Sequence, residues 1–81
     1  MERSEVERRV SAVIRKVLQL PPGDIRPEAN FIFDLGADSM QSLQLVAAFE
    51  EEFGVELDQE AALAVQTVSS AVDFLQANIK K

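Results

Sequence analysis

The sequence predicts an all-α fold: a small four-helix bundle with three principal helices, one short helix and a long loop between the first two. In three stretches, apolar residues recur at intervals of three and four positions, which is the pattern of helices with one buried face. Proline and glycine fall between these stretches, and no stretch predicts a strand. With 81 residues, 47% of them hydrophobic, the chain is expected to form one small globular domain.

The first helix is predicted at about residues 4–19. Ser4 and Glu7 have the spacing of a capping box, in which two side chains satisfy unpaired N–H groups at a helix start. One face of the helix carries an apolar stripe made of Val6, Val10, Val13, Val17 and Leu20. The basic residues on the other face, Arg8, Arg9, Arg15 and Lys16, could form a docking strip, but a solvated polar face is the preferred interpretation.

A long connection is predicted at about residues 21–37. Pro21-Pro22-Gly23 ends the first helix because proline cannot continue the backbone hydrogen-bond ladder. The connection contains several large apolar residues, so it is expected to be attached to the core. We expect Phe31 and Leu35 to be buried and Phe33 to be at least partly exposed.

The second helix, at about residues 39–53, has two apolar sides. At 100° per residue, its core side gathers Ser42, Leu45, Val46, Phe49 and Phe53. Its other side gathers Met40, Leu43 and Ala47, flanked by Gln44, Glu50 and Glu51, with Ser39 at its beginning. An exposed apolar side with a polar rim indicates a partner-binding patch, although a wider core contact would give the same pattern.

The second helix ends in Glu50-Glu51-Glu52, where the helix dipole disfavours negative charge. Three acids at this point could receive arginine and lysine from a partner, hold a divalent cation loosely, or form a solvated face. Gly54 ends the helix, and Val55 and Leu57 are expected to face the core.

Two helices are predicted after this link. A short one could form at residues 59–65, and the last runs at about 68–79 with Thr67 as its N-cap. The apolar stripe of this last helix contains Val68, Ala71, Val72, Leu75 and Ile79, and Lys80 and Lys81 follow it.

The charge and the missing residue types exclude several functions. A net charge of -6 disfavours nucleic acid and anionic lipid as ligands and favours basic proteins as partners. Without cysteine there is no disulfide or thiolate site; without histidine a serine hydrolase triad and a zinc site are not expected. No apolar run approaches the length of a signal peptide core or a membrane span. We therefore expect a cytoplasmic monomer with no metal.

Ser39 is the main candidate functional residue. A helix start presents unpaired N–H groups and a partial positive charge, so a hydroxyl placed there is accessible and an anion attached to it is stabilised. The competing interpretation is that Asp38 or Ser39 is only an N-cap, a position that both residue types favour.

The segments FIFDLGADS at 31–39, MQSLQLVAAFEEEFGVEL after it and AVDFL in the last helix resemble an acyl carrier protein over essentially the whole chain. The resemblance implies that Ser39, preceded by Asp38, carries 4'-phosphopantetheine, attached by a separate phosphopantetheinyl transferase that uses coenzyme A. The chain would then be a substrate and carrier, not an enzyme. It would present acyl thioesters to enzymes of fatty acid, lipid or polyketide biosynthesis that have basic docking patches.

The resemblance also implies a cavity for the acyl chain, lined by the core faces of the first, second and fourth helices. The candidate lining residues are Leu45, Val46, Phe49, Val65, Val72 and Leu75. The expected partner-binding residues are Phe33, Met40, Gln41, Leu43, Gln44, Ala47, Glu50 and Glu51.

The sequence departs from the family pattern around Ser39. Acidic residues are common in the family at positions occupied here by Phe33, Gln41, Gln44, Ala61 and Leu63. The docking surface is therefore less negative and more apolar, which changes partner choice more than it changes the acyl-carrying chemistry. We expect a specialised carrier and not the housekeeping carrier of fatty acid synthesis.

Two other functions fit the sequence less well. A peptidyl or aryl carrier of nonribosomal synthesis shares the same attachment chemistry, and an unmodified acidic helical module would bind partners without carrying cargo. An enzyme is the least favoured function, because no residue near Ser39 in sequence is suited to activate it.

Overall fold

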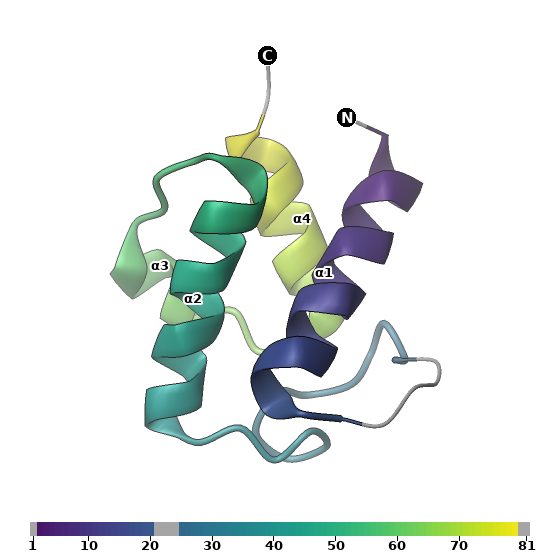
Figure 1. Ribbon diagram of the computed structural model, residues 1–81, viewed down its shortest axis with the longest axis vertical. Coiled ribbons are helices and arrows are strands. Elements are labelled where there is room, and N and C mark those ends of the chain that lie inside the picture. The colour runs from purple at the N-terminus through teal and green to yellow at the C-terminus, as the bar shows by residue number, and fades with distance from the viewer. Residues whose placement is uncertain (1, 21–24, 80–81) are drawn as a thin grey trace.

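The computed structural model describes residues 2–20 and 25–79, so the predicted stop at Pro21-Pro22-Gly23 and the terminal Lys80 and Lys81 lie outside the described residues. The described chain forms four helices in the order α1 (Arg3–Leu18), α2 (Ser39–Phe53), α3 (Gln59–Leu63) and α4 (Val68–Asn78). The described β-structure consists of an isolated bridge between Asn30 and Thr67. The predicted all-α fold with three principal helices and a short one is confirmed (Figure 1).

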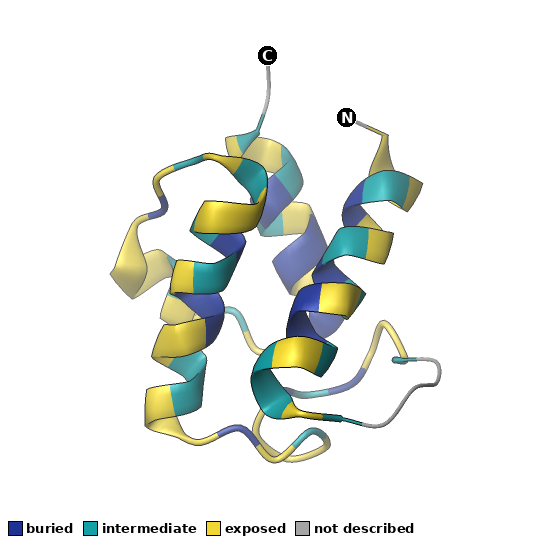
Figure 2. Ribbon diagram, in the orientation of Figure 1, coloured by how far each residue is buried: buried dark blue, intermediate teal, exposed yellow. Residues whose placement is uncertain are grey.

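The core lies between α1, α2 and α4. α1 packs against both α2 and α4, and α3 packs against α2 on the outside of the bundle (Figure 1). The buried faces of the three long helices point toward one another (Figure 2). The side chains that are fully buried are Val6, Val10, Ile14, Val72 and Leu75. Among the described residues, no polar or charged side chain is buried, so the core is entirely apolar.

The apolar stripe predicted for the first helix is confirmed and is wider than expected. Val6, Val10 and Val13 are buried as predicted, and Ile14, which the predicted stripe did not include, has no exposed surface. Ile14 lies four residues after Val10 and therefore on the same face of the helix. The helix ends at Gln19, which adopts a left-handed conformation and donates its N–H to the carbonyl of Arg15.

The predicted capping box at the start of α1 is wrong. The helix begins at Arg3, and the N-cap is Glu2, whose side chain makes no capping hydrogen bond. Glu7 instead pairs with Arg3, 3.2 Å from its Nε. The guanidinium of Arg3 also donates to Asp73 of α4 at 2.6 Å, and this hydrogen bond is the main reason why the pKa of Arg3 is raised. The helix thus begins one residue earlier than predicted, at Arg3, whose side chain contacts both Glu7 and α4.

The later helices follow the sequence pattern closely. Thr67 is the N-cap of α4, where its hydroxyl accepts a hydrogen bond from the N–H of Ser70 at 3.2 Å. The apolar stripe of α4 is buried as predicted at Val68, Ala71, Val72 and Leu75. The short helix is shorter than predicted, because α3 ends at Leu63 and Val65 lies in the turn that follows.

Candidate functional site

Asn30 organises the loop that leads to Ser39. Its side-chain oxygen accepts hydrogen bonds from the N–H groups of Ile32 at 2.9 Å and Phe33 at 3.0 Å. Its own N–H donates to the carboxylate of Asp34 at 2.7 Å, and its carbonyl accepts from the N–H of Asp34 at 2.9 Å. These bonds close a helix-like turn, which holds Ile32 and Phe33 in a fixed place although both are exposed.

The same loop is attached to the beginning of α4. Phe31 donates its N–H to the carbonyl of Gln66 at 3.0 Å, and Val68 donates to the carbonyl of Ala29 at 3.1 Å. The predicted attachment of the loop to the core is therefore confirmed, as are the burial of Phe31 and the exposure of Phe33. Leu35 was expected to be buried but is half-buried and packs against the core from its edge.

The start of α2 leaves the side chain of Ser39 outside the capping interactions. Asp38 is the N-cap: its carboxylate accepts a hydrogen bond from the N–H of Gln41 at 2.8 Å. The side-chain oxygen of Gln41 accepts from the N–H of Asp38 at 3.3 Å and completes a capping box. Ser39 is exposed, and its hydroxyl has no hydrogen-bond partner within the described part of the chain. The structure therefore assigns the capping role to Asp38 and leaves the hydroxyl of Ser39 accessible.

Exposed apolar side chains form a patch near this hydroxyl. We define the apolar patch as the five large hydrophobic side chains that are exposed: Ile32 (57%), Phe33 (87%), Met40 (68%), Leu43 (41%) and Leu63 (44%). Met40 and Leu43, together with Ala47, form the second apolar side of the helix, and all three are exposed. The alternative of a wider core contact on that side is thereby excluded. The sequence analysis did not place Ile32 in this patch, because its exposure depends on the turn built by Asn30.

Two residues predicted on the partner-binding face also make structural hydrogen bonds. Gln41 is half-buried and its side-chain oxygen is engaged in the capping box. Glu50 is also half-buried, and its carboxylate accepts a hydrogen bond from the N–H of Leu57 at 2.8 Å. Gln44, Ala47 and Glu51 are exposed, as a partner-binding role requires.

The side chains of the three acids at the end of α2 lie in three different environments. Glu50 binds the link after the helix, and Glu52 lies 3.7 Å from a guanidinium nitrogen of Arg9 in α1. Glu51 is exposed to solvent. In the described chain, no group of three or more acidic, histidine or cysteine side chains is arranged to hold a metal ion. The three acids therefore do not act as one cluster.

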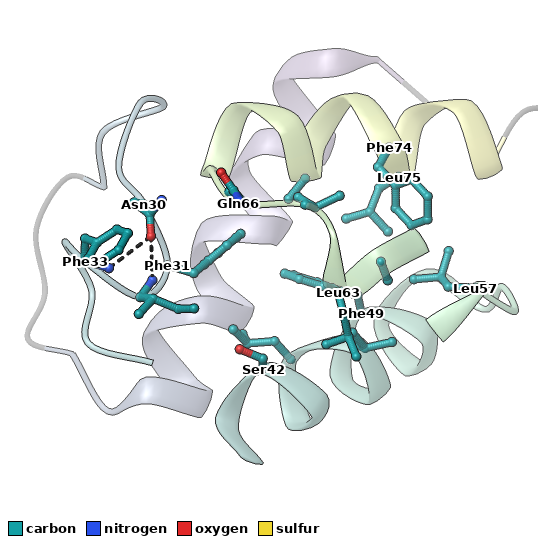
Figure 3. Close-up of a pocket in the computed structure, with 16 residues that line it drawn as sticks. Asn30, Phe31, Phe33, Ser42, Phe49, Leu57, Leu63, Gln66, Phe74 and Leu75 are labelled. Atoms are coloured by element: carbon teal, nitrogen blue, oxygen red, sulfur yellow. Dashed lines mark hydrogen bonds between the residues drawn. The ribbon is translucent and has the colours of Figure 1, made fainter. Parts of the chain in front are cut away.

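A cavity of about 150 Å³ lies between the loop, α2, α3 and α4 (Figure 3). It is lined by Asn30, Phe31, Ile32, Phe33, Ser42, Leu45, Val46, Phe49, Leu57, Ala62, Leu63, Val65, Gln66, Ala71, Phe74 and Leu75. Five of the six predicted lining residues are among them.

The exception is Val72, whose predicted place in the lining is wrong. Val72 is only 2% exposed and belongs to the core, on the face of α4 that meets the other long helices. The first helix was also expected to contribute, but no residue of α1 lines the cavity. The loop and α3 take its place, which the helical periodicity could not indicate because neither is a long amphipathic helix.

Comparison with known families agrees with this arrangement. The chain matches the family model described as the phosphopantetheine attachment site over residues 8–75, which includes Ser39, its cap and every residue that lines the cavity. None of the described helices combines the length and the apolar composition needed to cross a membrane. The chain therefore belongs to the phosphopantetheine attachment site family, whose members are carrier proteins that bear a 4'-phosphopantetheine group.

Proposed function

We propose that Ser39 is the attachment point of 4'-phosphopantetheine and that the chain carries acyl groups as thioesters on this arm. The observation that carries the proposal is the division of roles at the start of α2. Asp38 satisfies the helix N-terminus, and the adjacent hydroxyl of Ser39 is exposed without a partner among the described residues. A serine that only capped the helix would have its hydroxyl bonded to a backbone N–H.

The surroundings of Ser39 fit a phosphodiester. The first turn of α2 contains no acidic residue, and the partial positive charge of a helix start stabilises an attached anion. The chain has no histidine, so the transferase would supply the base that removes the proton from Ser39. The serine oxygen would then form a bond to the β-phosphorus of coenzyme A, and the nucleotide part would leave as adenosine 3',5'-bisphosphate.

The surface around Ser39 supports docking of acyl-transferring enzymes with a mixed apolar and basic face. No lysine or arginine occurs between residues 27 and 79, so α2, α3 and the loop from Pro27 onward offer a partner only negative and neutral side chains. The apolar patch lies within this surface, and Phe33 is its most exposed member. Apolar anchors supply much of the affinity of protein interfaces, and the charges around them mainly set the association rate.

This balance favours a specialised carrier of lipid or polyketide synthesis over the housekeeping carrier of fatty acid synthesis. Phe33 occupies a position at which the family commonly has an acid, and Gln44 is a neutral exposed residue on α2. A partner that relies on ionic contacts at these two positions would bind this chain weakly.

Transfer of the arm to Ser39 is the direct test. The purified protein is incubated with coenzyme A and a broad-specificity phosphopantetheinyl transferase, and the intact mass is measured. We expect one added arm on the unaltered protein and none on Ser39→Ala. Ser42→Ala, which removes a second hydroxyl one turn further along α2, is the matched control and should accept the arm. If the unaltered protein accepts no arm, the unmodified interaction module becomes the better explanation.

A further inference from the structure

The volume of the cavity sets a limit on what it can enclose. A dry apolar cavity of about 150 Å³ in another protein is known to hold benzene, so the cavity here, also about 150 Å³, has room for about six carbon atoms. A single aromatic ring or a chain of about six carbons would fill this space. A chain of twelve carbons would need about twice the volume.

The chemistry of the lining sets a second limit. Four of the five phenylalanines of the chain line the cavity, together with leucine, isoleucine, valine and alanine side chains. The polar lining residues are Asn30, Ser42 and Gln66, and no charged residue lines the cavity. A carboxylate or ammonium group would lose its hydration there without gaining a charged partner, which is strongly unfavourable. The enclosed part of a ligand must therefore be neutral and largely hydrocarbon.

The three polar lining residues lie at one end of the cavity, together with Phe31 and Phe33. Asn30, Gln66 and Ser42 lie toward the loop, whereas Leu57 and Phe74 lie at the far end (Figure 3). Ser42 is three residues after Ser39 in α2, which is a rise of about 4.5 Å along the helix. A chain that enters from the side of Ser39 would thus meet the polar end of the cavity first, with its hydrocarbon directed toward Phe74.

From these three observations we infer that the cavity encloses a short neutral acyl group, either a chain of about six carbons or a group with one ring. The inference rests on the proposed attachment of the arm to Ser39 and adds the class of cargo. Longer chains extend out of the cavity, and acyl groups that end in a carboxylate remain outside it. Phe74 lies at the far end together with Leu57, so the size of its ring should limit the length of chain that fits.

A series of acyl groups on one protein tests this size limit. The arm is transferred to Ser39 from acetyl, hexanoyl, octanoyl, decanoyl, dodecanoyl, phenylacetyl or adipyl coenzyme A, complete loading is verified by mass, and Tm is measured. We expect hexanoyl and phenylacetyl to raise Tm by about 4–8 °C relative to acetyl. Dodecanoyl should raise Tm no more than hexanoyl does, and adipyl should not raise Tm relative to acetyl. Chemical shifts of the methyl groups of Leu45 and Leu75 should change in the same order.

A pair of phenylalanine variants tests the role of Phe74. Phe74→Leu lengthens the cavity, so the chain length that gives the highest Tm should move from six carbons to eight or ten. Phe53→Leu is the matched control, because Phe53 is also half-buried on a helix but does not line the cavity, and its optimum should stay at six.

Three results would overturn the inference. These are a Tm that is independent of the acyl group, a Tm that still rises from hexanoyl to dodecanoyl, and equal stabilisation by adipyl and hexanoyl. The series on the unaltered protein decides the size limit even if Phe74→Leu does not fold. Failure of the arm to reach Ser39 would overturn the proposed function as well, and the mass reveals that case before any acyl groups are compared.

Discussion

At each end of α2 a carboxylate accepts a hydrogen bond from a backbone N–H, but the two ends expose different groups to solvent. At the start, the carboxylate of Asp38 accepts the N–H of Gln41 at 2.8 Å; at the end, the carboxylate of Glu50 accepts the N–H of Leu57, also at 2.8 Å. The start leaves an exposed hydroxyl beside apolar side chains, whereas the end leaves exposed negative charge. The helix therefore presents an exposed hydroxyl at one end and negative charge at the other, and one acid at each end has a structural role.

The comparison explains why an acid is tolerated where the helix dipole disfavours it. The dipole costs a carboxylate in the last turn a few tenths of a kcal/mol. A hydrogen bond to a charged acceptor contributes about 1.5–3 kcal/mol, so the bond from Leu57 to Glu50 outweighs the dipole several times. Gly54 makes this geometry possible, since its positive φ of 64° reverses the chain directly after α2.

The largest effect on stability is expected at the charged end. Glu50→Ala should lower the free energy of unfolding by about 1–2 kcal/mol because the N–H of Leu57 loses its acceptor. That loss corresponds to a decrease in Tm of about 4–8 °C for each kcal/mol, measured by thermal unfolding. The neighbouring Glu51→Ala is the control; it removes an exposed carboxylate and should change stability by less than about 0.5 kcal/mol. Equal effects of the two variants would show that the bond to Leu57 contributes nothing.

A smaller effect on stability is expected at the start of α2. Asp38→Ala removes the N-cap and should cost about 1 kcal/mol in urea unfolding, whereas Asp38→Ser keeps an acceptor and should cost only a few tenths. Asp38→Ser keeps the capping acceptor but removes the negative charge, so comparing it with Asp38→Ala separates the two contributions. If the negative charge also guides the transferase, arm transfer to Asp38→Ser should be a few-fold slower although its stability is kept. An alanine variant as stable as the serine variant would contradict the capping role.

The smallest effect on stability, and the sharpest on partner choice, is expected at Phe33. Its side chain is 87% exposed, so Phe33→Glu should change the unfolding free energy by less than about 0.5 kcal/mol. The substitution introduces an acid at the position where the resemblance to acyl carrier proteins implies that one is common. We expect kcat/KM to rise several-fold when a malonyl transferase of a housekeeping fatty acid synthase loads the protein.

Ala77→Glu adds a negative charge to an exposed residue of α4 that lies outside both the apolar patch and the cavity lining, and it is the matched control. An equal increase in both variants would mean that net charge, and not the side chain at position 33, sets partner choice. The selective role of Phe33 would also be contradicted if the unaltered protein supported the full elongation cycle as efficiently as a standard carrier does.

The parts of the fold that could be predicted from the sequence depend on neighbours along the chain. The stripe of Val6, Val10 and Val13 and the cap at Thr67 repeat at the spacing of a helical turn, so the sequence alone specifies them. The start of α1 could not be predicted in this way. Arg3 bonds to Asp73, which is 70 residues away in sequence, and no local pattern carries that information.

The same distinction applies to the site. The exposure of Met40 and Leu43 followed from the helical wheel, because a helix in a small bundle can bury only one side. The wheel places a residue on a face but does not identify its hydrogen-bond partner. Gln41 was therefore assigned to a partner surface although its side chain binds Asp38, and Val72 was assigned to the cavity although it lies in the core.

The walls of the cavity differ in how firmly they are held. The loop wall is joined to the chain before and within α4 by the bonds of Phe31 to Gln66 and of Val68 to Ala29. The opposite wall, α3, has five residues, none of them buried. Local opening of a protein begins where the fewest buried contacts must be broken. The cavity therefore has one firmly held wall and one weakly held wall: local opening would displace α3 first and leave the loop beside Ser39 in place.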